Sequence, residues 1–418
     1  MITLFLIIVL EIIFLSVIPI GIGNAETISL LLVIINTIIV TGTIEFGKAA
    51  QHRHIICTAY FLKIAIMLIS YYDIFPIMFT GADSVRFDQQ AFQIWQNPDL
   101  LNKKYGTLYQ PFLGNLYLII GPQKMVGQYF NVLLSTLGLV CIDKLLNRLK
   151  VEYKAAQIIM LLLSLSPVAI ILSSVLMRDA LVVNFFTFSF CLFLLYTLDK
   201  KIQFVLLSLL FLGLASAFHS GVFPFVICIL LYVFTEKGAK SNMAKVMCGV
   251  ITIVGVFVFW DTLFAKFSGL EKSESEILEQ LQDARGGSAY LTNLNSDNIF
   301  INLLYSPIKI VYFLFSPMPW NIRHLGDIVM LVLDSTIYYF ITLLIIRLRV
   351  FLHGRLLVSV TVGVLLVLFA FANGTHNTGT AARHRYKILP AICLIYGLLN
   401  SKRATYETAE DFDSDSCV

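Results

Sequence analysis

Long apolar segments recur along almost the whole of this sequence, and they restrict what the chain can fold into. A helix needs about 20 mostly apolar residues to span a bilayer, and residues 356–372, for example, contain no charged side chain. Only 13% of the 418 residues are charged and 58% are hydrophobic, whereas soluble domains carry about 25% charged residues. Because a water-soluble protein could not bury so much apolar surface, the chain is predicted to be an all-α, polytopic membrane helical bundle.

About twelve segments are long and apolar enough to be predicted as transmembrane helices. They lie near residues 2–22, 28–45, 55–79, 125–146, 156–176, 181–198, 203–218, 221–235, 246–264, 328–346, 356–372 and 388–400. The first has neither a basic start nor a small-residue cleavage site, so it is interpreted as a retained helix and not as a signal peptide. His219, Ser220 and Gly221 divide an apolar run that is too long for one helix.

Lysine and arginine in short loops predict the orientation, because they concentrate on the cytoplasmic side. Alternating helices place these loops on one side if residues 299–320 do not cross. The basic residues concerned are Lys48, Arg53, Arg148, Lys150, Lys154, Lys200, Lys201, Lys237, Lys240, Lys245, Arg347, Arg349, Arg355, Lys402 and Arg403. Both termini are then cytoplasmic. The prediction is a single membrane domain over 1–400 with large outer loops at 80–124 and 265–327, followed by a disordered acidic tail at 401–418.

Residues 299–320 are apolar enough to span the membrane, but they contain three prolines and Lys309. If the segment crossed, Arg347 and Arg349 would lie outside. It is therefore predicted to form a re-entrant or interfacial hairpin on the outer face. Irregular backbone is tolerated at that depth where protein or a water-filled cavity surrounds it.

The last predicted outer loop, 373–387, ends in a basic cluster formed by Arg383, His384, Arg385 and Lys387. The positive-inside rule disfavours such a cluster on the outer side, so an anionic ligand is the simplest explanation. Arginine presents a fork that matches phosphate oxygens in pairs, and a lipid diphosphate is an anion found at this depth. Anchoring to anionic headgroups is the alternative, but these lipids normally lie in the cytoplasmic leaflet.

Further polar residues are predicted on the same outer face, and each has two interpretations. They are Asp83, Arg86 and Asp88 in the first large loop, Arg178 and Asp179 at a helix junction, His219 at a helix break, and Arg323 and His324 after the hairpin. Asp83 or Asp88 could be a general base that takes the proton of an acceptor hydroxyl, or a solvated loop charge. Arg178 with Asp179 could bind substrate or form an interhelical ion pair. His219 could contact the substrate or supply polarity to a turn.

Other functional classes fit parts of the sequence. A transporter, such as a flippase for lipid-linked oligosaccharides, would need polar residues near the membrane centre; Glu11, Lys63 and Asp334 are candidates, although Lys63 could snorkel to an interface. An acyltransferase would need a histidine near the cytoplasmic side. That side carries His52, His54 and His353, without a recognisable acid partner. The seven cysteines show no metal-ligand or disulfide spacing, and no basic run indicates a nucleic-acid site.

Several motifs, in order along the chain, resemble those of a known family. They are GADSVRFDQQAFQIW, SSVLMRDA, AFHSGVF, ARGGSAY, FSPMPWNIRH and GTHNTGTAARHRYKILP, which extend over residues 81–390. The chain resembles the bacterial O-antigen and exopolysaccharide repeat-unit polymerases, with neighbours among the GT-C-type glycosyltransferases.

The resemblance implies a GT-C-like fold in the bacterial cytoplasmic membrane and a reaction at its periplasmic face. The donor would be a glycan on undecaprenyl diphosphate, the acceptor a lipid-linked repeat unit, and the partners a flippase and a chain-length regulator. Arg383, Arg385 and Arg178 would hold the diphosphate, and Asp83 matches the location of the family's acidic base. The large loop here follows the third helix, however, whereas GT-C enzymes carry it after the first. Fixed cations could replace a metal, so no cofactor is expected.

Overall fold

The computed structural model describes most of the chain, with gaps. The described residues are 25–45, 50–77, 82–103, 105, 107–236, 239–258, 289–291, 294, 298–348 and 354–401. Within these ranges the chain forms helices and no named strand. The helix predicted at 2–22 and the tail from residue 402 onward lie outside them.

Two compact units make up the chain. The first contains residues 1–147 and 160–184, and the second contains residues 148–159 and 185–418. Each unit has its own buried apolar core, which comes from the long apolar segments seen in the sequence.

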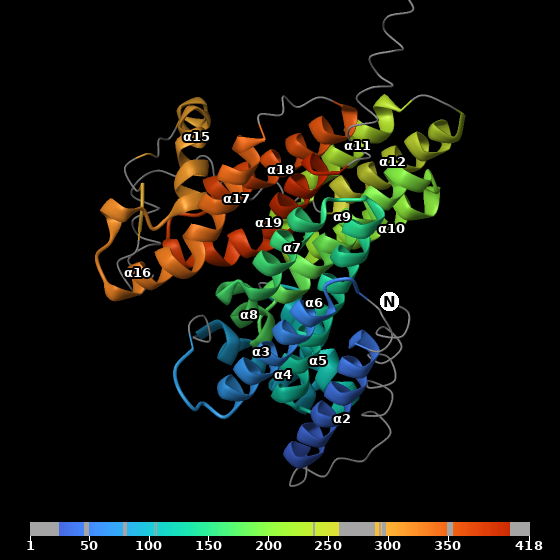
Figure 1. The fold of residues 1–418 in the computed structure, drawn as a ribbon. Coiled ribbons are helices and arrows are strands. Elements are labelled where there is room, and N and C mark those ends of the chain that lie inside the picture. The colour runs from blue at the N-terminus through green and yellow to red at the C-terminus, as the bar shows by residue number, and fades with distance from the viewer. Residues whose placement is uncertain are drawn as a thin grey trace, which may run out of the picture. The chain divides into compact units, whose positions relative to one another are not determined.

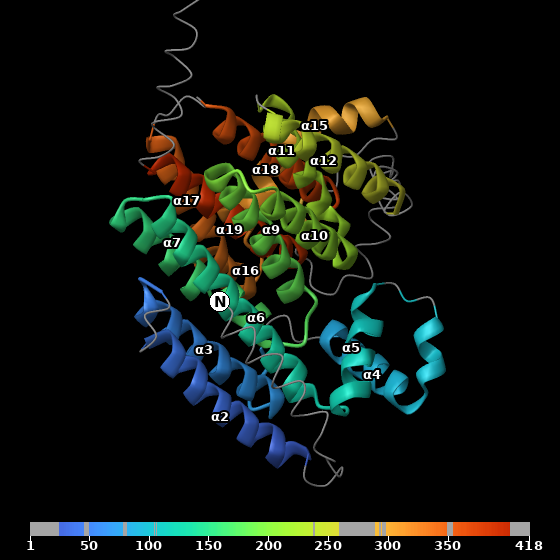
Figure 2. The same cartoon turned by 90° about the vertical axis from the view of Figure 1, so that its right-hand side faces the viewer.

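The first unit is built around α6, most of whose apolar length is buried. Its helices are α2 (Ala25–Glu45), α3 (Arg53–Tyr71), α4 (Ala82–Gln96), the short η1 (Pro98–Asn102), α5 (Tyr109–Ile120), α6 (Lys124–Arg148) and α8 (Pro167–Ser174), with α7 (Tyr153–Leu165) and α9 (Asp179–Asp199) shared between the units. Figure 2 shows α2 and α3 side by side.

The region 80–124, predicted as a long loop, contains two packed helices. Phe87 of α4 meets Tyr109 of α5 edge to face, with ring centroids 4.9 Å apart, and Ile94 packs over Gly114. The hydropathy pattern missed α4 because this helix is amphipathic, with polar residues on one face. The region 80–124 is thus a small helical layer.

The segment predicted as one helix near 156–176 is broken into α7 and α8, which differ in direction by 49°. The break falls at Ser166 and Pro167, where the Ser166 hydroxyl accepts a hydrogen bond from the Ala169 N–H. Serine at the N-cap followed by proline is a strong helix start. Local capping therefore overrides the continuous hydropathy.

The second unit centres on α18, which packs against α11, α15, α19 and the turn η2. Its α-helices, labelled in Figure 1, are α10 (Ile202–Phe218), α11 (Val226–Thr235), α12 (Ala239–Val258), α15 (Ile299–Phe315), α16 (Leu325–Met330), α17 (Thr336–Arg347), α18 (Arg355–Asn373) and α19 (Thr378–Leu399). Three short turns accompany them: η2 (Ser220–Phe225), η4 (Pro319–Asn321) and the π-helical η5 (Leu331–Ser335). The break predicted at His219 is confirmed by the end of α10 and the η2 turn.

Six of the described helices are long and apolar enough to cross a bilayer, and a seventh span results if α7 and α8 act together. Four shorter apolar helices, of 10 to 17 residues, accompany them. These features are consistent with a multi-pass helical membrane protein. The part of the chain that the structure describes does not show the twelve spans that hydropathy predicts.

Residues 299–315 form one helix, α15, and not the predicted hairpin. Pro307 lies inside this helix and does not end it, because neighbouring helices can compensate for the lost hydrogen bond in an apolar bundle. The chain turns at Ser316 and Pro317, after the last residue of α15. Of the prolines expected to break the segment, Pro307 does not, whereas Pro317 lies at the turn after α15.

Lys63 was expected to snorkel, but its amine is buried in the first unit. It donates a hydrogen bond of 2.6 Å to the Ser135 hydroxyl of α6. The neighbouring hydroxyls of Tyr60 and Tyr129 lie 2.8 Å apart. The lysine is thus part of a polar seam between α3 and α6, so snorkelling does not explain it.

Gly363 allows α18 to approach α11 closely. A Cβ atom at this position would lie 3.3 Å from the Cα atom of Cys228 and even closer to its side chain. Because backbone cannot move as easily as a flexible side chain, the helices would have to separate to accept any larger residue.

We expect Gly363→Ala to lower the free energy of unfolding by about 1–3 kcal/mol, because overpacking forces such a shift. Thermal unfolding of the purified protein in detergent measures the change. The matched control is Gly213→Ala in α10, where a Cβ atom meets nothing within 4 Å and alanine favours the helix. Equal losses of stability in both variants would contradict the tight contact between α11 and α18.

Candidate functional site

The basic cluster predicted at the end of a loop lies on a helix. α19 begins at Thr378, ten residues before its predicted start at 388, because the Asn377 side chain accepts hydrogen bonds from the N–H groups of Gly379 and Thr380. Asparagine is a strong N-cap. The predicted loop 373–387 is therefore reduced to a short connection, and its basic residues are held rigidly.

Helical geometry divides this cluster between two faces of α19. At 3.6 residues per turn, Arg383, His384 and Lys387 lie on one face, whereas Arg385 points to the opposite side. Arg383 and His384 are half-buried, and Lys387 and Arg385 are fully buried. We call Arg383, His384 and Lys387 the basic face.

Two imidazole rings meet beside the basic face. The His219 ring, from the break after α10, lies edge to face against the His384 ring with centroids 5.0 Å apart. Both pack on Phe371 at the end of α18, at 5.1 and 4.8 Å. The Lys387 amine lies 5.8 Å from the centre of the same Phe371 ring, within the range of a cation–π contact. Phe371 thus organises the site.

The hydrogen bonds of these histidines constrain their chemistry. His219 Nδ1 accepts the Gly221 N–H at 3.3 Å, so in the neutral ring the proton is assigned to Nε2, which makes Nε2 a donor. His384 Nδ1 lies 3.0 Å from the Thr375 hydroxyl. The hydrogen bond to Thr375 links His384 to the end of α18, and ring contacts link His219 to Phe371 and His384.

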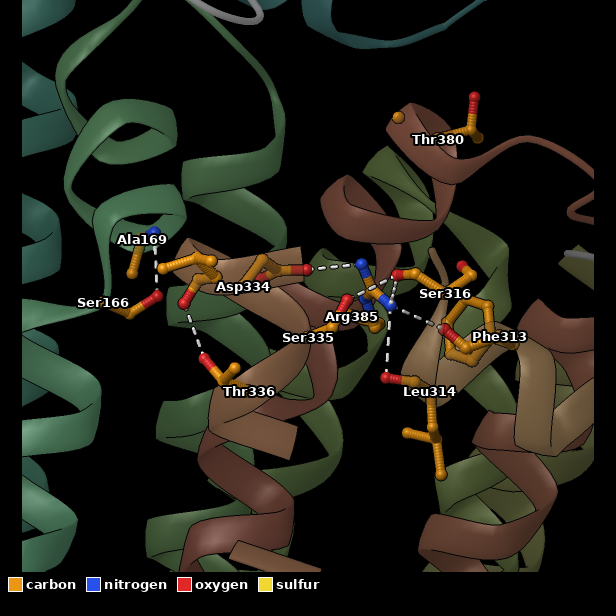
Figure 3. A network of polar contacts seen from close by, with 12 residues as sticks. Ser166, Ala169, Phe313, Leu314, Ser316, Asp334, Ser335, Thr336, Thr380 and Arg385 are labelled. Atoms are coloured by element: carbon orange, nitrogen blue, oxygen red, sulfur yellow. Dashed lines mark hydrogen bonds and ion pairs between the residues drawn. The ribbon is translucent and has the colours of Figure 1, made fainter. Parts of the chain in front are cut away.

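Arg385 has a different environment from the basic face (Figure 3). One guanidinium nitrogen pairs with the Asp334 carboxylate at 2.5 Å. The other donates to three backbone carbonyl groups at the end of α15. Their residues and distances are Phe313 at 3.2 Å, Leu314 at 3.1 Å and Ser316 at 2.5 Å. These carbonyls are among those that a helix C-terminus leaves without intrahelical partners, and a cation is favourable there.

These contacts favour a structural role for Arg385, and its predicted role in holding the ligand stays a prediction. Its side chain is 0% exposed and its contacts join α15, the η5 turn and α19. They also account for Asp334, the intramembrane carboxylate that the sequence left unexplained. The residues of α19 that are better placed to bind a ligand are those of the basic face, on the opposite side of the helix from Arg385.

Arg323 and His324 lie just before α16 and are both exposed. Their backbone N–H groups donate to the Asp327 carboxylate at 3.0 and 3.1 Å, which caps the helix. The Arg323 side chain lines a small polar hollow together with Tyr290, Ser316 and other residues. The predicted contact of His324 with the substrate remains a prediction.

The first unit holds the predicted acidic residues. Asp83 forms an ion pair of 2.8 Å with Arg86, one turn along α4, and both are partly exposed, so this pair contributes little to stability. Asp88 accepts a hydrogen bond of 2.5 Å from the Tyr117 hydroxyl of α5. Burial, followed by the charge of Asp88, raises the pKa of Tyr117 well above its ordinary value, which keeps the phenol a donor to the carboxylate.

Arg178 and Asp179 mark the start of α9. Asn131 fixes this turn, since its amide donates to the backbone carbonyls of Val175 at 2.8 Å and Met177 at 3.2 Å. Asp179 is fully buried in the first turn of α9, where the helix dipole stabilises a carboxylate. Arg178 is half-buried beside it. This setting supports a structural role for Asp179, while substrate contact by Arg178 remains a prediction.

The predicted site residues therefore fall into two groups. The first unit contains Asp83, Arg86, Asp88, Arg178 and Asp179, and the second contains His219, Arg323, His324, Arg383, His384 and Arg385. Within the second unit, His219 and His384 come together around Phe371, beside Lys387. Phe371 was missed because it lies in a continuous apolar run, where hydropathy cannot distinguish a core residue from a site residue.

His52 has an acid partner that the sequence did not reveal. Its Nδ1 lies 2.6 Å from the Asp143 carboxylate, and both side chains are buried in the first unit. Asp143 also accepts the Gln51 N–H at 2.5 Å, so it helps to begin α3. Because the two residues are 91 positions apart, no local motif could have indicated the pair.

Comparison with known proteins adds no assignment to this site. No family model, no curated protein and no solved structure matches the chain. Within the described ranges, no three His, Cys, Asp or Glu side chains are grouped so that they could hold a metal ion. The resemblance to repeat-unit polymerases therefore remains a prediction, and the site must be interpreted from its own chemistry.

We expect Arg385→Ala to lower the free energy of unfolding by about 3–5 kcal/mol, because it leaves the Asp334 carboxylate buried without its cation. The double variant Arg385→Met with Asp334→Leu should lose less, since no buried charge remains. Chemical unfolding in detergent measures this double-mutant cycle. Arg383→Ala, on the other face of α19, is the control with the smaller expected loss. A double variant as unstable as Arg385→Ala would contradict the importance of the ion pair.

Proposed function

We propose that this chain is a membrane glycosyltransferase, a polymerase that joins lipid-linked oligosaccharide repeat units at a membrane surface. The supporting observation is the basic face of α19, where Arg383, His384 and Lys387 accumulate on a helix that contains no acidic residue. Charge within an apolar bundle is costly, so it indicates a function by default. A polyprenyl diphosphate has the complementary charge and an apolar tail suited to the surrounding helices.

The basic face would bind the diphosphate of the donor. Arg383 provides a fork for two phosphate oxygens, and Lys387 provides a second positive charge. His219 presents its Nε2–H as a further donor, since its Nδ1 is occupied by the Gly221 N–H. Charges held in position in this way stabilise negative charge as it develops on a leaving group.

The reaction is a displacement at the anomeric carbon of the donor sugar. The acceptor hydroxyl oxygen forms a bond to this carbon, and the bond from the carbon to the diphosphate oxygen breaks. The lipid diphosphate leaves with the bonding electrons, and a carboxylate takes the hydroxyl proton. The bases predicted from the sequence, Asp83 and Asp88, belong to the first unit, and their part in this reaction stays a prediction.

A flippase for the same lipid-linked substrate is the alternative. The residues that favour a flippase are the buried polar residues Lys63 and Asp334, which could line a path through the membrane. The structure gives each of them a side-chain partner, Ser135 and Arg385 respectively. These contacts account for both residues without a translocation path, so the alternative has less support than the transferase.

We expect Arg383→Ala to slow glycan elongation about 100-fold, because loss of one fixed charge at a leaving group has an effect of this order. The assay uses the purified full chain in lipid nanodiscs with undecaprenyl-diphosphate-linked repeat units, and it measures product length by gel electrophoresis. Arg383→Lys should retain part of the activity, since it keeps the charge but loses the fork.

Lys154→Ala, an exposed lysine at the start of α7, is the control for loss of a positive charge and should elongate normally. Product lengths that do not change in Arg383→Ala would remove this residue from the site. If the wild-type chain moved the lipid-linked substrate between leaflets without elongating it, the flippase would replace the proposed enzyme.

A further inference from the structure

Two cations meet on one buried tyrosine ring in the second unit, where α9 and α11 end and α18 begins. The Lys200 amine and the Arg355 guanidinium carbon each lie 4.8 Å from the centre of the Tyr232 ring, within the range of cation–π contacts. Tyr232 is fully buried near the end of α11, and its hydroxyl accepts a hydrogen bond of 2.7 Å from the Lys200 amine. We call Lys200, Tyr232 and Arg355 the Tyr232 cluster.

Lys200 is held in its place by the backbone and by its partners. It directly follows the last residue of α9, and its φ of 54° lies in the left-handed region that favours glycine. Its amine forms an ion pair of 2.6 Å with Glu236. Burial lowers the pKa of Lys200, but the hydrogen bonds with Glu236 and Tyr232 outweigh burial and raise the pKa above its ordinary value. Lys200 therefore keeps its charge at neutral pH.

Arg355 is a cation at the start of a helix, where the helix dipole disfavours positive charge. It is the first residue of α18, and the first turn of this helix contains no acidic residue. One guanidinium nitrogen donates to the Thr235 carbonyl at 3.2 Å, at the end of α11. None of the carboxylates in the described part of the chain forms an ion pair with Arg355. Its position is thus fixed, whereas its charge is not neutralised by these residues.

Positive charge exceeds negative charge around the Tyr232 cluster. Glu236 neutralises Lys200, while Arg355 and the exposed Lys201 add two further positive charges. Cations that only set the orientation of a membrane protein need no ordered surroundings. Lys200 and Arg355, in contrast, are ordered by a buried ring, a carboxylate and a helix-end carbonyl. An excess of positive charge that is held in this way indicates an anionic ligand.

Exposed apolar side chains lie near the cluster on two helices. On α11 they are Leu231 and Phe234, and on α18 Val358 is exposed one turn after Arg355. The two helices pack against each other, and Figure 1 shows them side by side. In a membrane protein such a surface can accommodate acyl chains next to the cations, which together favour a lipid with a charged headgroup.

We propose that the Tyr232 cluster, with Lys201 beside it, binds the headgroup phosphate of an anionic phospholipid. Arginine offers a fork to two phosphate oxygens, and lysine offers a point charge. Basic pockets between transmembrane helices bind such headgroups at the cytoplasmic side, which is the side that the sequence predicts for these residues. The acyl chains of the lipid would pack on Leu231, Phe234 and Val358.

This lipid is a different molecule from the donor of the proposed transferase, and its site does not depend on that function. Arg355 begins α18, whereas Phe371, beside the basic face, lies near the end of the same helix. At 1.5 Å per residue, they are separated by about 24 Å along the helix axis. One headgroup could not reach both places.

Lipid titration tests the site. The full chain in detergent is titrated with phosphatidylglycerol or with phosphatidylcholine of the same acyl chains, and native mass spectrometry measures the dissociation constant of the first bound lipid. The wild type should bind phosphatidylglycerol about tenfold more tightly. Arg355→Gln should remove this preference, because a charge-assisted hydrogen bond has an effect of this order, whereas Arg355→Lys should keep part of it. Lys154→Gln, at an exposed lysine of α7, is the matched control and should bind as the wild type does.

Two further variants keep the test decisive. Lys201→Gln changes an exposed residue and should weaken phosphatidylglycerol binding about threefold, even if Arg355→Gln does not fold. Arg383→Ala, on the basic face, should bind this lipid as tightly as the wild type does. The site is overturned if the wild type binds both lipids equally, or if Lys154→Gln loses as much affinity as Lys201→Gln. Full displacement of the lipid by millimolar inorganic phosphate would also overturn it, since the ligand would then be a soluble anion.

Discussion

The buried contact between Arg385 and Asp334 is the constraint on which the second unit depends. Lipid cannot solvate a charged group or the open end of a helix, so both must find partners within the protein. Arg385 meets these two requirements at once. Its guanidinium pairs with Asp334 on one side and binds the carbonyls that end α15 on the other. One side chain thereby joins α15, the π-helical turn before α17, and α19.

This contact also prepares the surface on which the proposed chemistry depends. The helical period turns the basic face away from Arg385, toward the histidine pair and Phe371. Arg385 holds the Ser316 carbonyl as well, and Ser316 forms part of the polar hollow. A structural cation therefore supports the basic face from the opposite side of the same helix. Site geometry of this kind requires support from residues that do not touch the ligand.

Much of the fold could be predicted from hydropathy, since α2, α6, α9, α10 and α18 all coincide with predicted apolar segments. The failures have local causes. Pro307 was expected to break a helix that continues through it, whereas Ser166 and Pro167 break one that was expected to continue. The amphipathic α4 carries too many polar residues for a hydropathy window. Packing decides the first case, because neighbouring helices compensate for the hydrogen bond lost at Pro307, whereas local capping decides the second.

The sequence by itself determined that the chain is built of apolar helices and that basic residues gather near its C-terminal end, because hydropathy and charge are properties of composition. Only the tertiary structure decided which of those residues is structural. Arg383 and Arg385 are two positions apart and identical in type, yet one lies on the basic face and the other is buried against Asp334, 51 residues earlier in the chain. Partners so distant in sequence meet only when the helices pack, so no local pattern records them.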